Sequence, residues 1–208
     1  MRRFIFLILV CCFHIYSVRA QGSVNQEKVK QQINAVALSM KSLQCDFVQT
    51  KHVKLLNDKM VSYGKMYYQQ ANRLRWEYTS PYSYTFVLNN NKVLLKKGSR
   101  SDVINVNQSK FFGEIARIMM NSVVGKCLTD SKSFKTSIAA SGSEYVATLL
   151  PQQKQMKQMF QKIILHISKT QSVVTQVELI EKKGDRTVIV LKNIKKNTAI
   201  NASNFKVN

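Results

Sequence analysis

The feature of the sequence that most constrains the fold is an alternation of apolar and polar residues with a period of two. It begins at residue 44 and returns in short runs almost to the end of the chain. Residues 73–79 show it clearly, because Leu74, Trp76 and Tyr78 fall on one face of an extended chain and charged residues fall on the other. Short runs of this kind, separated by turns, favour an antiparallel meander over βαβ units.

Two segments interrupt this alternation with helical periodicity. Residues 24–43 place Val29 and Ile33 on one apolar stripe, and residues 109–124 form a second amphipathic segment among the strands. Gly64 interrupts a strand pattern and predicts a bulge or a close approach of neighbouring groups. We predict strands at residues 44–52, 59–69, 73–79, 82–88, 92–97, 102–106, 134–139, 144–150, 161–168, 173–181, 187–193 and 204–207.

The N-terminus has the pattern of an export signal. Two arginines precede an apolar stretch of about 15 residues, shorter than the roughly 20 that span a bilayer. Val18-Arg19-Ala20 ends this stretch with small residues at the −3 and −1 positions. We expect residues 1–20 to be a signal peptide cut after Ala20, residues 21–208 to be one mature domain, and the periplasm to be its location. A membrane anchor and a lipid-modified cysteine are the alternatives.

The chain is strongly basic, with 32 Lys and Arg against 11 Asp and Glu. Without the three arginines of the leader the balance is 29 to 11, a net charge of +18. The lysines occur singly or in pairs, and no aromatic RNA-binding motif or zinc spacing accompanies them, so we expect no nucleic-acid partner. The charge fits a solvated basic surface, or an attraction to anionic headgroups or to an acidic partner.

The sequence offers little for catalysis. His52 and His166 are far apart, and no C-x-x-C, nucleophile elbow or phosphate-binding glycine loop is present. We therefore predict no metal site, no cofactor and no enzyme activity, and Asp46 is the one carboxylate to test. Cys45 and Cys127 are either a disulfide or two buried thiols, and the spacing does not decide between them.

Several short motifs occur along the chain in a characteristic order. They are Phe47-x-Gln49, Tyr63-Gly64-x-Met66-Tyr67, Arg73-Leu74-Arg75-Trp76-x-Tyr78-x-x-Pro81, Gly184-Asp185-Arg186-Thr187, Asn193-Ile194 and Asn204-Phe205-Lys206-Val207. In this order and spacing the chain resembles the LolA family, the periplasmic carriers of outer-membrane lipoproteins. The resemblance covers nearly all of the chain after the leader.

The resemblance implies a half-open antiparallel β-barrel of about 11 strands, covered by an N-terminal helix and a central lid helix. An apolar cavity inside the barrel would bind the acyl chains of a lipoprotein. The cavity residues that it implies are Phe47, Leu74, Trp76, Tyr78 and Phe86. The lid residues that it implies are Phe112, Ile115 and Met119.

The resemblance also concerns the control of the lid and the partners. The family often latches its lid with an arginine near the end of the second strand, and the matching residue here is Gln70, which lacks the charge. Arg73 is the alternative latch. The implied partners are acylated lipoproteins or other lipid cargo, an inner-membrane ABC-type release complex and an outer-membrane acceptor, with the carrier acting as a monomer.

The composition leaves the cargo open. Ten Phe, eight Tyr and eight Met residues supply adaptable apolar surfaces, which suit a cavity for flexible ligands as well as an ordinary core. Apolar pockets discriminate weakly among similar chains. A carrier of another lipid or glycolipid, or a lipid sensor on the same fold, is therefore the alternative.

Overall fold

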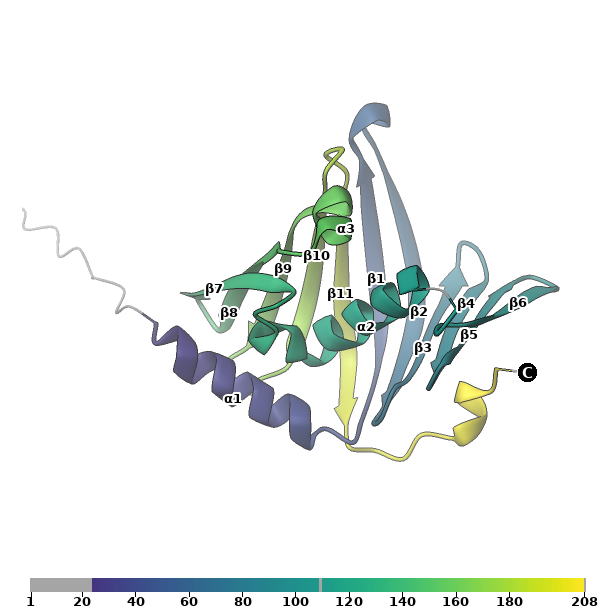
Figure 1. The fold of residues 1–208 in the computed structure, drawn as a ribbon, viewed down its shortest axis with the longest axis horizontal. Coiled ribbons are helices and arrows are strands. Elements are labelled where there is room, and N and C mark those ends of the chain that lie inside the picture. Colours follow the sequence, from purple (N-terminus) through teal and green to yellow (C-terminus); the bar gives the residue numbers. More distant parts are fainter. Residues whose placement is uncertain (1–23, 109, 208) are drawn as a thin grey trace, which may run out of the picture.

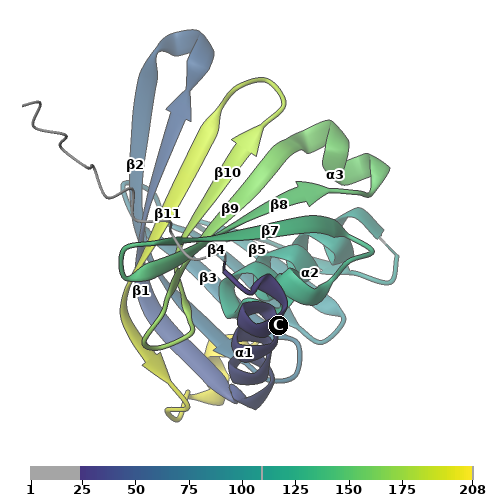
Figure 2. The same ribbon diagram turned by 90° about the vertical axis from the view of Figure 1, so that its left-hand side faces the viewer.

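The computed structural model of the protein describes residues 24–108 and 110–207, and for residues 110–116 it describes the backbone alone. One eleven-stranded sheet curves around helix α2 (Lys110–Val124), and helix α1 (Gln26–Ser39) lies at one end of the sheet (Figures 1 and 2). No helix in this part of the chain has the length and apolarity to cross a bilayer. The predicted signal peptide, residues 1–20, lies outside the described residues.

Each strand overlaps a segment that the period-two pattern predicts. The strands are β1 (Ser42–Val53), β2 (Asp58–Gln69), β3 (Arg73–Ser80), β4 (Tyr84–Asn89), β5 (Lys92–Lys97), β6 (Arg100–Asn105), β7 (Phe134–Ser141), β8 (Glu144–Pro151), β9 (Phe160–Ser168), β10 (Val174–Glu181) and β11 (Arg186–Lys196). The short helical elements are η1 (Lys54–Leu56), η2 (Lys126–Thr129), α3 (Lys154–Met159) and η3 (Ala202–Phe205).

The order of strands across the sheet is β6-β5-β4-β3-β2-β1-β11-β10-β9-β8-β7. Strands that are neighbours in sequence pair within β1–β6 and within β7–β11, and β1 pairs with β11, so the first and last strands meet in the middle of the sheet. Within the described residues β6 and β7 are the two edges and do not pair with each other, so the barrel stays open. This confirms the predicted half-open antiparallel β-barrel of about 11 strands with its two helices.

Helix α1 closes one end of the core. The Asn25 side chain caps its start by accepting a hydrogen bond from the backbone N–H of Lys28 at 3.0 Å. The helix ends at Ser39 and is shorter than the predicted 24–43, because the chain turns extended at Met40 to enter β1. Its buried side chains are Val29, Ile33 and Ala37.

The sequence-based prediction of a strand at residues 204–207 is wrong. This segment follows β11, crosses to the outer face of the sheet and forms η3 against β3 and β4. Both sides of β1 are already paired, so no sheet edge lies near the end of β11. The Asn201 side chain instead accepts a hydrogen bond from the Ser203 N–H, Phe205 is buried, and Asn89 Nδ2 donates to the Phe205 carbonyl at 3.0 Å.

Gly64 lies at a very close approach between β1, β2 and β3, as the interrupted strand pattern predicts. The register between β2 and β3 shifts at Tyr63 and Gly64. A Cβ at Gly64 would overlap the Glu77 carbonyl oxygen and the ring of Phe47. Glycine is therefore the residue that lets the Phe47 ring lie flat against the inner face of the sheet.

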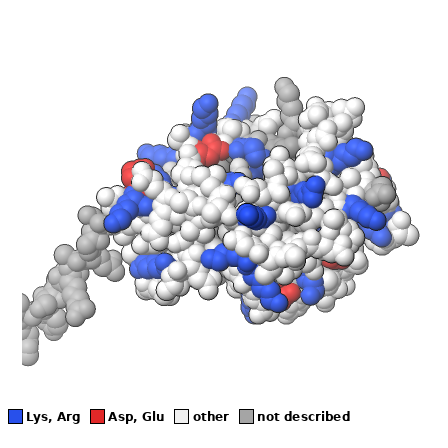
Figure 3. All heavy atoms as spheres, turned by 90° about the horizontal axis from the view of Figure 1, so that it is seen from below, with Lys and Arg blue, Asp and Glu red and all other residues white. Residues whose placement is uncertain are grey.

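Basic residues are spread over the end of the molecule that carries α1. Figure 3 shows that Lys and Arg lie there singly, with few Asp or Glu among them. This agrees with the sequence, in which lysines occur singly or in pairs. On this face the charge has the form of a solvated basic surface.

Candidate functional site

An apolar cavity of about 240 Å³ lies between the inner face of the sheet, helix α2 and helix α3. The sheet contributes side chains from β1, β3, β9, β10 and β11, and the helices contribute the opposite wall. The lining residues are Gln49, Trp76, Tyr78, Ile118, Met119, Ser122, Val123, Met156, Met159, Phe160, Ile163, Val177, Leu179 and Ile189. Most of them are aliphatic, aromatic or thioether side chains, the type of lining that suits a flexible apolar ligand.

The period of two places the sheet residues of this wall. Trp76 and Tyr78 lie two apart on β3, and Val177 and Leu179 lie two apart on β10, so each pair faces the same side of the sheet. The residues on either side of Trp76 in the strand, Arg75 and Glu77, are charged. They pair with each other instead, and Arg75 Nη2 lies 3.0 Å from Glu77 Oε1. The curvature of the sheet then brings β3 and β10 to opposite sides of one cavity.

An aromatic cluster lies on the side of β1 and β3, where Trp76 and Tyr78 line the cavity and Phe47 packs against them. Phe47 stacks on Trp76 with ring centroids 4.4 Å apart, and it meets Tyr78 edge-on at 5.2 Å. The Tyr78 hydroxyl donates to Gln49 Oε1 at 2.9 Å, which satisfies its hydrogen bond inside an apolar wall. Burial raises the pKa of the Tyr78 hydroxyl above its ordinary value, so this group stays protonated and able to donate.

The structure brings three of the predicted site residues to the cavity: Trp76, Tyr78 and Met119. Three further predicted cavity residues are buried in the core of the same barrel without lining the cavity as it stands; these are Phe47, Leu74 and Phe86. The predicted lid residues Phe112 and Ile115 belong to α2, and their side chains lie outside the described part of the structure. Their roles toward a ligand stay predictions.

Sequence reasoning missed the wall on the side of α3. Met156, Met159 and Phe160 line the cavity from a segment that is largely polar in sequence. Three large apolar residues within such a segment are the signal that could have found this wall. Ile163 on β9 and Ile189 on β11 carried no distinguishing signal, because every strand alternates in the same way.

An ion pair attaches helix α2 to the segment that precedes β7. Arg117 Nη1 lies 2.8 Å from Asp130 Oδ2, and Arg117 Nη2 donates to Ser133 Oγ at 3.0 Å. Burial opposes the ionisation of Asp130, but the hydrogen bonds from Arg117 and Ser133 outweigh it and lower the pKa of the carboxyl below its ordinary value. The carboxylate is therefore charged and holds the C-terminal half of α2 against the segment before β7.

The predicted latch residues make other contacts in this structure. Gln70 Nε2 donates to the Leu38 carbonyl of α1 at 3.3 Å, and Arg73 Nη1 donates to Gln69 Oε1 at 3.2 Å. Gln70 thus links the end of β2 to helix α1. A role of Gln70 or Arg73 in holding the lid stays a prediction.

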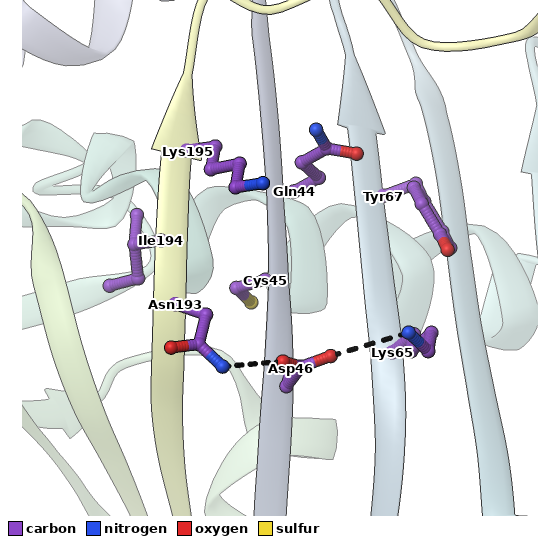
Figure 4. A pocket seen from close by; sticks show the side chains of 8 residues that line it. All are labelled: Gln44, Cys45, Asp46, Lys65, Tyr67, Asn193, Ile194 and Lys195. Atoms are coloured by element: carbon purple, nitrogen blue, oxygen red, sulfur yellow. Dashed lines mark hydrogen bonds and ion pairs between the residues drawn. The ribbon is translucent and has the colours of Figure 1, made fainter.

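A second, larger hollow of about 520 Å³ lies on the outer face of β11, β1 and β2 (Figure 4). Asp46 is one of its lining residues; Asn193 Nδ2 donates to its carboxylate at 2.7 Å, and Lys65 Nζ lies 3.7 Å away. The hollow is shallow and mostly polar, and both oxygens of this carboxylate already have partners. We therefore take the apolar cavity as the candidate site.

Neither of the two cysteines in the described part of the chain forms a disulfide. Cys45 and Cys127 are both free and buried, which decides between the two possibilities that the sequence leaves open. Burial is the main cause that raises the pKa of each thiol to about 12. Both are therefore protonated, unreactive thiols at neutral pH. Among the described residues, no group of three or more His, Cys, Asp or Glu could hold a metal ion.

An open barrel with an apolar cavity under a helix defines a class of proteins that enclose apolar ligands. The family model "Outer membrane lipoprotein carrier protein LolA" matches residues 38–208. The chain therefore belongs to the LolA family. An outer-membrane lipoprotein carrier protein of Legionella pneumophila (strain Lens) is 27% identical over 208 residues, which cover 100% of this chain and 94% of the relative.

Solved structures share the fold at low identity. The crystal structure of MucB has a TM-score of 0.53 and 11% identity, over 90% of this chain and 64% of MucB. The MucB of the Pseudomonas aeruginosa MucA/MucB complex has a TM-score of 0.53 and 12% identity, over 87% of this chain and 61% of that chain. The chain thus spans less than two thirds of these MucB chains, and the likeness concerns the fold alone.

Proposed function

We propose that this protein binds the acyl chains of lipoproteins in the cavity beneath α2 and carries them from the inner to the outer membrane. The apolar cavity between the open sheet and α2 is the observation that carries this proposal. Each CH₂ group exposed to water costs about 0.8 kcal/mol, so an acylated protein needs such an enclosure to cross an aqueous space. The family and the Legionella relative, which is named as a carrier, support the same role.

The proposal includes the route of the chain and its partners. Residues 1–20 are the signal peptide, cut after Ala20, and residues 21–208 are the carrier domain, which works in the periplasm as a monomer. An inner-membrane ABC-type complex loads the carrier and an outer-membrane acceptor unloads it. The carrier itself performs no chemical reaction, because holding and releasing an acyl chain breaks no covalent bond.

The size of the cavity requires α2 to move when cargo enters. About 240 Å³ is less than the roughly 300–1,000 Å³ of small-molecule pockets, and an acylated lipoprotein has more than one chain. Ile118, Met120 and Val123 of α2 are buried in the closed state. An entering chain replaces these apolar contacts with others of the same kind, so opening and closing stay close to balance and the cargo can be released.

Two buried polar atoms suit the carbonyl end of an acyl chain. Trp76 and Ser122 line the cavity, and their Nε1 and Oγ atoms are buried and have no hydrogen-bond partner of good geometry among the described residues. Trp76 does interact with the Tyr78 hydroxyl, and Ser122 with the Cys127 thiol. An ester or amide carbonyl could accept a hydrogen bond from either atom, which would offset the cost of burying them.

Native mass spectrometry of the delipidated mature protein with a synthetic triacylated lipopeptide tests the proposal. Met119→Glu and Leu179→Glu place a carboxylate in the cavity wall at residues that are only partly buried, so the fold should tolerate them. A carboxyl group enclosed with an acyl chain loses its hydration, and even in its protonated form this costs up to about 3 kcal/mol, so affinity should fall by up to about a hundredfold. Val103→Glu, on an exposed residue of β6, is the matched control and should bind like the wild type.

Three outcomes distinguish a lipoprotein carrier from a carrier or sensor of another lipid and from a protein with a different binding site. Binding of the lipopeptide that both cavity variants lose supports the carrier. Co-purification of a different lipid from the periplasm, with no affinity for the lipopeptide, would replace it with a carrier or sensor of another lipid or glycolipid. Binding that Met119→Glu and Leu179→Glu leave unchanged would refute this cavity as the site.

A further inference from the structure

The hairpin of β1 and β2 projects beyond the rest of the sheet. Each of its strands has 12 residues, but β3 pairs with β2 only as far as Tyr63 and Ser80. Residues 58–62 of β2 extend past the end of β3, by about 17 Å at about 3.4 Å per residue. On the other side, β11 pairs with β1 as far as His52 and Arg186, so the hairpin projects less far beyond β11. Figures 1 and 2 both show the hairpin standing above the other strands, at the end opposite to α1.

Large apolar side chains cover the end of this hairpin. We call residues 54–60 the hairpin tip. Leu55 is 92% exposed and its neighbour Leu56 is 69% exposed, and Met60 is 53% exposed. Isolated apolar residues are common on protein surfaces, but two adjacent leucines at the most projecting point of a molecule mark an interaction site.

Specific contacts hold the hairpin tip in its shape. Asn57 adopts a positive φ of 48° and donates its N–H to the Lys54 carbonyl at 3.3 Å, which closes the turn η1. The Lys54 N–H donates to Asp185 Oδ1 at 3.1 Å, and Lys51 Nζ lies 3.4 Å from Glu181 and 3.6 Å from Asp185. The turn between β10 and β11 therefore supports the tip, and the leucines are presented rather than left loose.

Cations surround the two leucines. Among the described residues, four exposed lysines of the tip and of the turn at residues 182–185 make no ion pair: Lys54, Lys59, Lys182 and Lys183. The acidic residues near them are Asp58, Glu181 and Asp185, and the last two already face Lys51. Positive charge is therefore in excess near the two leucines. The net charge of the whole sequence is also positive, at +21.

We propose that the hairpin tip docks on a bilayer that contains anionic lipids, with Leu55 and Leu56 inserted between headgroups and the lysines on the phosphates. A specific protein interface needs about 1,200–2,000 Å² of buried surface with a complementary shape, and a narrow convex tip offers little of either. A bilayer accepts a small apolar point without a matching pocket, and each lysine near an anionic surface adds to binding.

The cavity lies toward the same end of the barrel. Leu179 is two residues before Glu181, Phe160 pairs with Glu181, and Gln49 and Tyr78 lie on the parts of β1 and β3 nearest the tip. Docking at the tip would turn these residues toward the membrane. If the proposed function holds, an acyl chain could then pass between the bilayer and the cavity with little exposure to water.

Vesicle flotation of the cargo-free mature protein tests the docking. Vesicles of phosphatidylethanolamine and phosphatidylglycerol provide the anionic surface, and phosphatidylcholine vesicles the neutral one. Leu55→Ser combined with Leu56→Ser removes the apolar point without changing the charge. Lys182→Gln combined with Lys183→Gln lowers the charge alone. Leu38→Ser is the matched control, because Leu38 is 57% exposed on α1, at the other end of the molecule.

Binding to the anionic vesicles should fall about tenfold or more with either double variant, and should fall with added salt for the wild type. The control should bind like the wild type. As a second readout, an environment-sensitive dye on Leu55→Cys should shift to the blue on these vesicles and one on Leu38→Cys should not, since the native thiols are buried.

The tip proposal is overturned if the leucine variant floats like the wild type, if Leu38→Ser loses as much binding, or if the dye at residue 55 does not shift. Equal binding to phosphatidylcholine would remove the role of the lysines and overturn the anionic specificity. The assay contains no lipoprotein, so its failure leaves the cavity assay untouched. Failure of the cavity assay likewise leaves vesicle docking untouched.

Discussion

Replacing Gly64 by alanine should damage the protein far more than its single methyl group suggests. The new Cβ would overlap the backbone oxygen of Glu77 and the ring of Phe47. A backbone oxygen within a paired sheet cannot move aside cheaply, so the cost should be about 3 kcal/mol, at the upper end of overpacking penalties. For a domain of this size, that corresponds to a fall in Tm of about 6–12 °C.

Gly142→Ala is the matched control for this experiment. Gly142 lies in the turn after β7 with a φ of +52°, and a Cβ there would meet nothing within 4 Å. Its cost is only the strained backbone, about 1 kcal/mol, or about 2–4 °C in Tm. The comparison therefore separates steric overlap in the sheet from backbone strain in a turn.

Thermal and urea unfolding measure both variants, and Trp76, the single tryptophan of the sequence, reports on the site. Because Phe47 stacks on Trp76 at 4.4 Å, displacement of Phe47 should also change the Trp76 emission in Gly64→Ala but not in Gly142→Ala. If Gly64→Ala loses no more stability than Gly142→Ala, the close approach of Phe47 to Gly64 is wrong, and with it this wall of the cavity.

Two further predictions concern titratable groups. The folded-state pKa values of Asp130 and Glu178 lie below their ordinary values of 3.8 and 4.5, so their charged forms stabilise the fold above these values, and this stabilisation is lost as the pH falls through the folded values. Asp130→Asn should therefore lower the free energy of unfolding at neutral pH and reduce its decline between about pH 5 and 3; an unchanged decline would contradict the role of Asp130. Cys45 and Cys127 should resist alkylation in the folded protein and react fully in urea, and fast labelling of the native protein would contradict their burial.

Much of the fold could be predicted from the sequence, because the side of the sheet that a side chain faces depends only on its position along the strand. The alternation of Leu74, Trp76 and Tyr78 predicts which side of β3 is apolar, and the structure confirms that Leu74 and Trp76 are buried. The same alternation in β10 predicts an apolar face for Val177 and Leu179, but not that this face lies across a cavity from Trp76. That arrangement depends on the curvature of the whole sheet.

The wrong prediction of a strand near the C-terminus has the same origin. Residues 204–207 have apolar residues at strand spacing, yet they form η3 on the outer face, because β2 and β11 already occupy both sides of β1. Gln70 matches the position of the family latch, and its role toward the lid stays a prediction; in this structure it bonds to the Leu38 carbonyl of α1. In both cases a neighbour distant in sequence decides what the local residues do.

The sequence by itself determined the approximate positions of the eleven strands, the facing of their side chains, the two main helices and the family. These follow from the period of the apolar pattern and from short motifs, which need no knowledge of distant contacts. Only the tertiary structure decided that α3 completes the cavity, that Cys45 and Cys127 stay apart, and that Leu55 and Leu56 stand exposed. Each depends on how segments distant in sequence are arranged, such as β1 and β11, whose pairing joins the two ends of the chain in the middle of the sheet.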